Sequence, residues 1–160
     1  MKLTWDRLDY MMEIAGWFLV AAALFITIYF YPKLPDTIPS HFNAAGEADG
    51  WSGKGTIWVS PAIAFILFVG IRILTNYPHH LNYITAIAEE NAEYQYRLAT
   101  RLLRSINLII AGVFFYLQWS IVNAALGKWE GSGTWFLPMF ISLMVFNVVY
   151  YMVKSTRKSS

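Results

Sequence analysis

The chain has 160 residues, of which 57% are hydrophobic and only 14% are charged, and its formal net charge is +2. Soluble domains average roughly 45–50% apolar and about 25% charged residues, so this composition excludes a disordered chain and argues against an ordinary water-soluble domain. The small net charge gives no footprint for nucleic acid, and the lack of cysteine excludes disulfides, Cys₄ zinc sites and thiol nucleophiles.

The first predicted element is an uncharged apolar segment at residues 14–31. A helix needs about 20 apolar residues to cross the roughly 30 Å of a bilayer core, and this segment is close to that length. Acids are mixed with bases before it (Asp6, Asp9 and Glu13), and a proline-rich stretch follows it. Neither feature is typical of a cleaved signal peptide, so we expect an uncleaved transmembrane helix.

A loop rich in proline and glycine follows at residues 32–56. Its three prolines favour extended backbone, which predicts a short strand over Thr37–Phe42. Asp49-Gly50 is a turn signal. We therefore expect an ordered loop that folds onto the membrane surface.

The second apolar segment, residues 57–77, contains Arg72 as its only charged residue. Ser60 followed by Pro61 is typical of an N-cap and the first helical position. Arg72 lies near the end of the segment, where its long side chain is expected to reach the lipid headgroups.

Residues 81–104 contain no glycine or proline, and their apolar residues recur at spacings of three and four. This pattern predicts an amphipathic helix, which either continues into the next span or lies along the membrane face. Glu93 and Arg97 are placed for an ion pair between neighbouring turns.

The third and fourth apolar segments, residues 105–126 and 135–153, are uncharged. Asn107 and Gln118 are eleven residues apart, so they share one face of the third helix. These intramembrane polar groups favour two alternatives: a path for an ion or small solute, or hydrogen bonds between helices. The fold class is therefore an all-α integral membrane protein with one domain and four transmembrane helices.

The distribution of lysine and arginine predicts the orientation. Nine of these residues fall in the two tails, the 81–104 region and the adjacent Arg72, against three in the other two loops. Because cytoplasmic segments carry the excess of positive charge, both termini are expected in the cytoplasm, the loop 32–56 outside and the amphipathic helix inside. The predicted location is the inner membrane, which the chain crosses several times.

His41 and nearby carboxylates form a candidate metal site. Imidazole and carboxylate groups bind divalent ions such as zinc, so Asp36, His41 and Asp49 are the candidate ligands. The alternative is that the carboxylates cap turns and His41 makes a hydrogen bond within the loop.

The same loop carries a longer pattern. Leu-Pro-Asp, Ile-Pro, His-Phe-Asn, Gly, Asp-Gly-Trp and Lys follow one another between Leu34 and Lys54. It resembles the signature of a bacterial membrane domain of unknown function that also forms the N-terminal part of SdpI-type toxin-immunity proteins. The resemblance implies an inner-membrane protein that protects against a secreted toxin and holds a regulator at the membrane. The residues expected to bind a ligand are Pro35, Asp36, Pro39, His41, Phe42, Asn43, Gly46, Asp49, Trp51 and Lys54.

Three function classes follow from these observations. The first is a binding or sensory protein of the immunity-like type, whose outer loop recognises a peptide, toxin or small ligand and whose inner helix reports to a cytoplasmic regulator. The second is a metal-binding protein or metal-dependent enzyme centred on His41. The third is a small transporter subunit that forms its path as a homo-oligomer. The sequence favours the first class, with the lipid bilayer as a constant partner and no nucleic acid.

Overall fold

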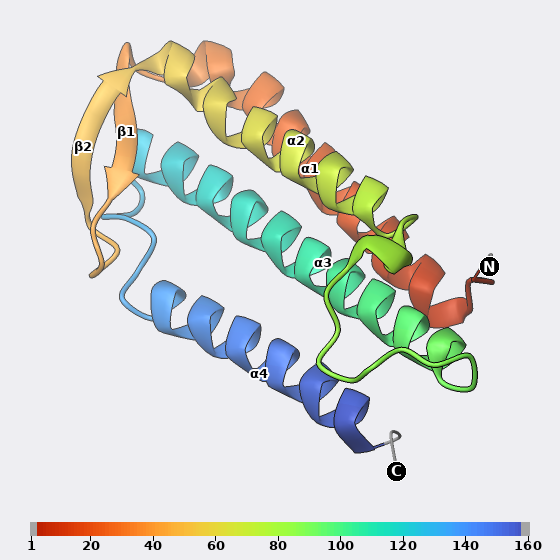
Figure 1. Cartoon of the computed structure of the whole chain (residues 1–160). Helices are drawn as coiled ribbons and strands as arrows, with labels where there is room; N and C mark the ends of the chain where they lie inside the picture. The colour runs from red at the N-terminus through yellow and green to blue at the C-terminus, as the bar shows by residue number, and fades with distance from the viewer. Residues whose placement is uncertain (1–2, 158–160) are drawn as a thin grey trace.

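The computed structural model describes residues 3–157 (Figure 1). Its four long helices are α1 (Arg7–Phe30), α2 (Val59–Leu74), α3 (Ala92–Ala125) and α4 (Phe136–Arg157). With the 3₁₀ turns that adjoin α1 and α2 included, all four are long and apolar enough to cross a membrane, which supports the four predicted spans and fits a multi-pass membrane protein. The all-α class needs a correction, because β1 (Thr37–Phe42) and β2 (Ala48–Gly53) form a hairpin between α1 and α2.

The four helices run side by side, with α3 in contact with each of the other three (Figure 1). Among the helices, α4 packs mainly on α3. The hairpin and the α3–α4 connection lie together at one end of the bundle, here named the hairpin end. Both chain ends and the connection between α2 and α3 lie at the opposite end, here named the termini end.

Helix α1 begins seven residues before the predicted span because its first turn is capped. The Asp6 side chain accepts hydrogen bonds from the backbone N–H groups of Leu8 and Asp9, at 3.0 and 3.1 Å. The Asp9 carboxylate accepts the N–H of Asp6 at 3.0 Å, which completes a capping box. Two of the acidic residues that argued against a signal peptide in the sequence therefore cap the start of the helix.

The prediction that Ser60 caps α2 is wrong. A short 3₁₀ helix, Lys54–Trp58, leads directly into Val59, so Ser60 already lies in the first turn and its hydroxyl has no partner among the described residues. Pro61 and Pro138 are each the third residue of their helices. A proline is tolerated there because the first N–H groups of a helix have no intrahelical partner.

The prediction of a helix over 81–104 is wrong for its first half. Residues 81–91 form turns and irregular backbone, and α3 begins at Ala92. The Asn91 side chain accepts the N–H of Ala88 at 2.9 Å and donates to the carbonyl of Ala86 at 3.0 Å, so it stabilises a turn in place of a helix. The amphipathic part is thus a direct extension of the third span, and its predicted pair of Glu93 with Arg97 is confirmed at 3.4 Å.

Two apolar clusters hold the bundle together. The first joins α1, the hairpin, the 3₁₀ helix before α2 and α3 near the hairpin end and consists of Ile26, Leu34, Ile38, Ile57 and Val122. The second lies deeper between α1, α2 and α3 and consists of Val20, Phe68 and Ala111. Because Ile38 is fully buried in the first cluster, the hairpin is packed onto the helices.

The termini end is held by an ion cluster that links α1 to α2 and α3. Asp9 pairs with Arg104 at 3.0 Å and with Arg101 at 3.3 Å, and Glu13 pairs with Arg72 at 2.8 Å. Asp9 and Arg104 are almost completely buried. Because Asp9 and Arg104 are removed from solvent, each of these two charges depends on its partner.

Arg72, which is predicted from the sequence to reach the lipid headgroups, has a carboxylate partner on another helix. Its guanidinium pairs with Glu13 and lies 4.7 Å from the centre of the Trp5 ring. The Arg104 guanidinium lies 4.5 Å from the same ring, so the indole contacts both cations. The tail before α1 is thereby fixed to the other helices.

Candidate functional site

The candidate site is the β-hairpin that carries the recognised pattern. Its strands pair antiparallel, with Thr37 opposite Gly53 and Phe42 opposite Ala48, which confirms the predicted strand over Thr37–Phe42. The predicted turn at Asp49-Gly50 is wrong, because both residues lie within β2. The chain instead reverses between the strands, at residues 43–47.

Asn43 and Gly46 build that turn. The Asn43 side chain accepts the N–H of Glu47 and donates to its carboxylate, each at 3.0 Å. Gly46 has a φ of +79°, a conformation that side chains other than glycine rarely adopt. These two motif residues therefore shape the hairpin, which is a local reason for their presence in the pattern.

The turn is docked on the α3–α4 connection. The N–H of Ser132 donates to the carbonyl of Gly46 at 2.7 Å, and Glu47 and Gly131 form an isolated bridge. A Cβ atom on Gly131 would lie 1.9 Å from the Gly46 oxygen, so the two backbones meet at a distance that only glycine permits. The hairpin is thus anchored at its tip as well as at its base.

Asp36 and Lys54 close the base of the hairpin. The N–H of Lys54 donates to the Asp36 carbonyl at 2.8 Å, and its ammonium group contacts the Asp36 carboxylate at 2.9 Å. Pro35 is exposed just before Asp36. Pro39 is buried and lies opposite Trp51, a residue that is 57% exposed.

His41 and Asp49 face one another across the strands. The Nδ1 atom of His41 lies 2.5 Å from an oxygen of Asp49, and both side chains are exposed, at 70% and 43%. The bond to Asp49 leaves Nε2 of the imidazole for another partner. The predicted metal set is not assembled, because Asp36 is paired with Lys54 and residues 3–157 contain no group of three His, Asp or Glu side chains that could hold an ion.

A groove of about 480 Å³ opens beneath the hairpin, between β1, α2 and α3. We name it the hairpin groove. It has an apolar wall and a polar rim, and it is lined by Pro39, Ser40, His41, Phe42, Thr56, Val59, Ser60, Ile63, Phe114, Leu117 and Ile121. A second hollow of about 300 Å³ lies between the turn, α3 and α4, and His41, Phe42 and Leu117 line both. His41 and Phe42 are therefore the motif residues that face open space on two sides.

Asn107 and Gln118 lie inside the bundle. Asn107 donates to the carbonyl of Phe68 at 3.0 Å, and Gln118 donates to the Thr27 hydroxyl at 2.8 Å and to the carbonyl of Ile57 at 3.3 Å. Both side chains therefore link α3 to neighbouring segments. Their carbonyl oxygens have no partner among the described residues.

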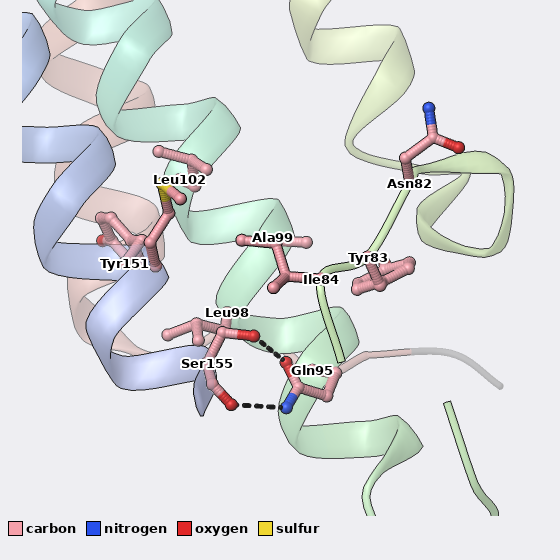
Figure 2. Close-up of a pocket in the computed structure, with 10 residues that line it drawn as sticks. Asn82, Tyr83, Ile84, Gln95, Leu98, Ala99, Leu102, Tyr151 and Ser155 are labelled. Atoms are coloured by element: carbon pink, nitrogen blue, oxygen red, sulfur yellow. Dashed lines mark hydrogen bonds between the residues drawn. The ribbon is translucent and has the colours of Figure 1, made fainter. Parts of the chain in front are cut away.

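A smaller cavity of about 80 Å³ lies at the termini end, between α3, α4 and the segment before α3 (Figure 2). There Gln95 and Ser155 exchange two hydrogen bonds: the Gln95 amide donates to the Ser155 carbonyl at 3.0 Å, and the Ser155 hydroxyl donates to the Gln95 side-chain oxygen at 2.7 Å. Burial raises the pKa of Tyr83 at its edge to about 12. The phenol therefore stays neutral when folded, and its ionisation favours unfolding between about pH 10 and 12.

The Gln95–Ser155 pair gives a direct prediction. Gln95→Leu removes both hydrogen bonds, and we expect it to lower the free energy of unfolding by about 1–2 kcal/mol, since each net hydrogen bond contributes roughly 1 kcal/mol. Amide hydrogen exchange should rise in the last turns of α4 and stay unchanged in α1. Equal exchange in wild type and variant would show that the pair does not hold α4.

The hairpin and the helix ends beside it are also the part of the chain that matches a family model. Residues 18–65 match a domain of unknown function, DUF1648. The match covers the second half of α1, the whole hairpin and the start of α2, so the predicted resemblance to a membrane domain of unknown function is supported. The link to immunity proteins and the bacterial origin stay predictions.

One relative is an uncharacterized protein of Archaeoglobus fulgidus, 27% identical over 110 residues. The alignment covers 60% of this chain and 60% of the relative, so the chain spans less than two thirds of that protein's length. No solved structure matches the chain.

Proposed function

We propose that this chain is a binding or sensory protein of the bacterial inner membrane, similar to the SdpI-type immunity proteins, which takes an amphipathic peptide into the hairpin groove. The observation that carries the proposal is the position of the groove. Motif residues on β1 form its rim, and apolar residues of two membrane helices form its wall. In the predicted orientation the hairpin end faces outward, where a secreted peptide arrives.

The chemistry of the groove favours an amphipathic ligand. Ile63, Phe114 and Ile121 offer apolar contact, whereas the exposed His41 side chain offers polar contact. The Ser60 hydroxyl is buried behind this lining and has no partner among the described residues, so the exposed His41 side chain is the main polar group that the groove offers. Ligand pockets commonly combine an apolar lining with a few polar groups in this way.

Helix α3 supplies the connection to the other face. It contributes Phe114 and Leu117 to the groove and Gln95 to the contact with α4 at the termini end. A change of packing around Leu117 therefore acts on the same helix that a cytoplasmic regulator would contact. In this proposal the regulator also contacts the two chain tails, which are predicted to be cytoplasmic.

A dye placed in the groove tests the proposal. The chain has no cysteine, so Ile63→Cys can carry one environment-sensitive fluorophore in the groove, and Ile66→Cys, also on α2 but outside the groove, is the matched control. Cationic amphipathic helical peptides of about 20 residues are titrated onto the protein in nanodiscs. We expect a saturable emission change at position 63 that His41→Ala weakens several-fold, and none at position 66. Equal responses at both positions, or none at either, would contradict the proposal.

The pair of His41 and Asp49 keeps metal chemistry as a second candidate. The short contact presents a neutral or charged imidazole with Nε2 directed away from the carboxylate, which suits one metal ligand or a proton acceptor. Metal analysis of the protein purified without chelator separates the two candidates. Equimolar zinc that is absent from His41→Ala would favour a metal site, and metal-free protein of unchanged stability would favour peptide recognition.

Transport is the third candidate, and it depends on Asn107 and Gln118. Solute flux through the protein in liposomes should fall in Asn107→Leu and Gln118→Leu if these residues line a path. In the structure both amides donate to neighbouring segments, which supports a packing role.

A further inference from the structure

The connection between α3 and α4 gathers three aromatic rings around an open hollow at the hairpin end. The hollow has a volume of about 460 Å³ and is lined by Tyr116, Trp129, Glu130, Gly131, Ser132, Gly133 and Trp135. The Tyr116 ring centre lies 6.2 Å from that of Trp129 and 5.1 Å from that of Trp135. We name the three rings together with Glu130 the aromatic cage.

Backbone and side-chain hydrogen bonds fix the cage. The N–H groups of Lys128 and Trp129 both donate to the carbonyl of Asn123, at 2.8 and 3.3 Å, which holds the chain directly after α3. The Tyr116 hydroxyl donates to the carbonyl of Ser132 at 2.7 Å, which ties the ring to the loop. The rings are therefore positioned before any ligand arrives, so binding costs little conformational entropy.

The charge of the cage is not neutralised by the chain itself. Within residues 3–157, Glu130 forms no ion pair, and no lysine or arginine lies over any of the three rings. Elsewhere the chain does place its own cations on aromatic rings, as with Lys33 on Tyr29 at 3.3 Å. Aromatic faces beside a free carboxylate attract a cation.

We propose that the aromatic cage binds a quaternary ammonium group. Tyr116, Trp129 and Trp135 supply the aromatic lining, with one face of the Tyr116 ring stacked on Phe136, and Glu130 supplies the counter-charge. A quaternary ammonium carries no N–H donors, so it loses less on leaving water than a lysine ammonium and gains contact with the rings. The same chemistry occurs in free betaine-like solutes and in the choline headgroup of a membrane lipid. This site is separate from the hairpin groove and does not depend on the proposed peptide binding.

Tetramethylammonium is the probe that tests the cage. The protein is labelled with 5-fluorotryptophan in phosphatidylglycerol nanodiscs, and its fluorine resonances are assigned by single Trp→Phe variants. We expect the resonances of Trp129 and Trp135 to shift saturably, with a Kd of about 1 mM, a weak affinity suited to a small cation. Sodium chloride at equal ionic strength should leave them unchanged, and so should the probe at Trp17 and Trp119.

Substitutions in the cage separate recognition from partition into the membrane surface. Trp129→Leu and Glu130→Gln should each weaken tetramethylammonium binding about tenfold. Trp58→Leu is the matched control, because Trp58 also lies at the hairpin end and is 40% exposed, the same fraction as Trp129. Binding that is unchanged by both cage variants, or lost equally in the control, would overturn the proposal.

The choice of nanodisc lipid distinguishes the two sources of the ligand. If a lipid headgroup occupies the cage, phosphatidylcholine alone should shift the Trp129 and Trp135 resonances and block the later response to tetramethylammonium. If a free solute is the ligand, the response to tetramethylammonium should be the same in both lipids. Absence of any selective shift in either lipid would show that these tryptophans serve only as membrane-interface anchors.

Discussion

Replacing Asp9 by asparagine is expected to lower the free energy of unfolding by about 3–5 kcal/mol, because removing one partner of a buried ion pair leaves the other charge uncompensated. Asp9 is 1% exposed and is the shared partner of Arg101 and Arg104. Asparagine keeps the volume but loses the negative charge. The measurement is unfolding of the purified protein in mixed micelles by titration with a denaturing detergent, followed by circular dichroism.

Asp6→Asn is the matched control for this prediction. Asp6 pairs with the same Arg101, but its side chain is 47% exposed, so its ion pair is expected to contribute less than about 1 kcal/mol. A second variant, Asp9→Leu combined with Arg104→Met, removes both buried charges and should recover much of the lost stability. If Asp9→Asn proves as stable as Asp6→Asn, the ion cluster does not hold the termini end.

Gly131→Ala is expected to detach the hairpin tip from the α3–α4 connection. The new methyl group would lie 1.9 Å from the Gly46 oxygen, where the neighbouring atoms are backbone and cannot rotate away. Overpacking of this kind costs about 1–3 kcal/mol, and here the cost is relieved by loss of the hydrogen bond from Ser132 to Gly46. Amide exchange at residues 43–47 and at Ser132 should therefore rise at least about tenfold.

The control for the hairpin prediction is Gly55→Ala. An added Cβ at Gly55 meets no atom within 4 Å, so the substitution should leave exchange in the hairpin unchanged. Because His41 and Phe42 stand between the turn and the hairpin groove, Gly131→Ala should also weaken the dye response at position 63. Unchanged exchange at residues 43–47 would show that the tip is held by contacts other than this backbone approach.

Hydropathy alone was sufficient to predict the four spans, since each is an apolar run of sufficient length. The ion cluster could not be predicted in the same way. Asp9 and Arg104 are 95 residues apart, and no local pattern indicates which acid meets which base. The sequence therefore predicted that Arg72 extends to the lipid headgroups, and it gave no sign that the carboxylate partner of Arg72 is Glu13 on another helix.

In the hairpin, too, some structure could be predicted from the local sequence and some depends on contacts between segments that are far apart in the chain. The strand over Thr37–Phe42 follows from its extended, proline-rich backbone, but both Asp49-Gly50 and the segment around Gly46 carry turn signals. In the structure the chain turns at the segment around Gly46, where the Gly46 backbone packs against Gly133 and Ser132. Several residues expected to bind a ligand, among them Asp36, Asn43 and Lys54, instead complete hydrogen bonds inside the hairpin. The candidate site therefore contains fewer residues than the sequence pattern, and His41 and Phe42 are the ones that face the hairpin groove and the neighbouring hollow.

The ion cluster also sets an order for biosynthesis. The acids on α1 leave the ribosome long before Arg101 and Arg104 of α3, so α1 enters the bilayer while its carboxylates have no arginine partners. The three-helix unit can close only after the amphipathic start of α3 has been made. Because α4 packs mainly on α3, it joins last, onto a bundle that is already assembled. A chain stalled before α3 should thus keep the pair of Glu13 with Arg72 but leave Asp9 without its arginine partners, so that half of the ion cluster is missing.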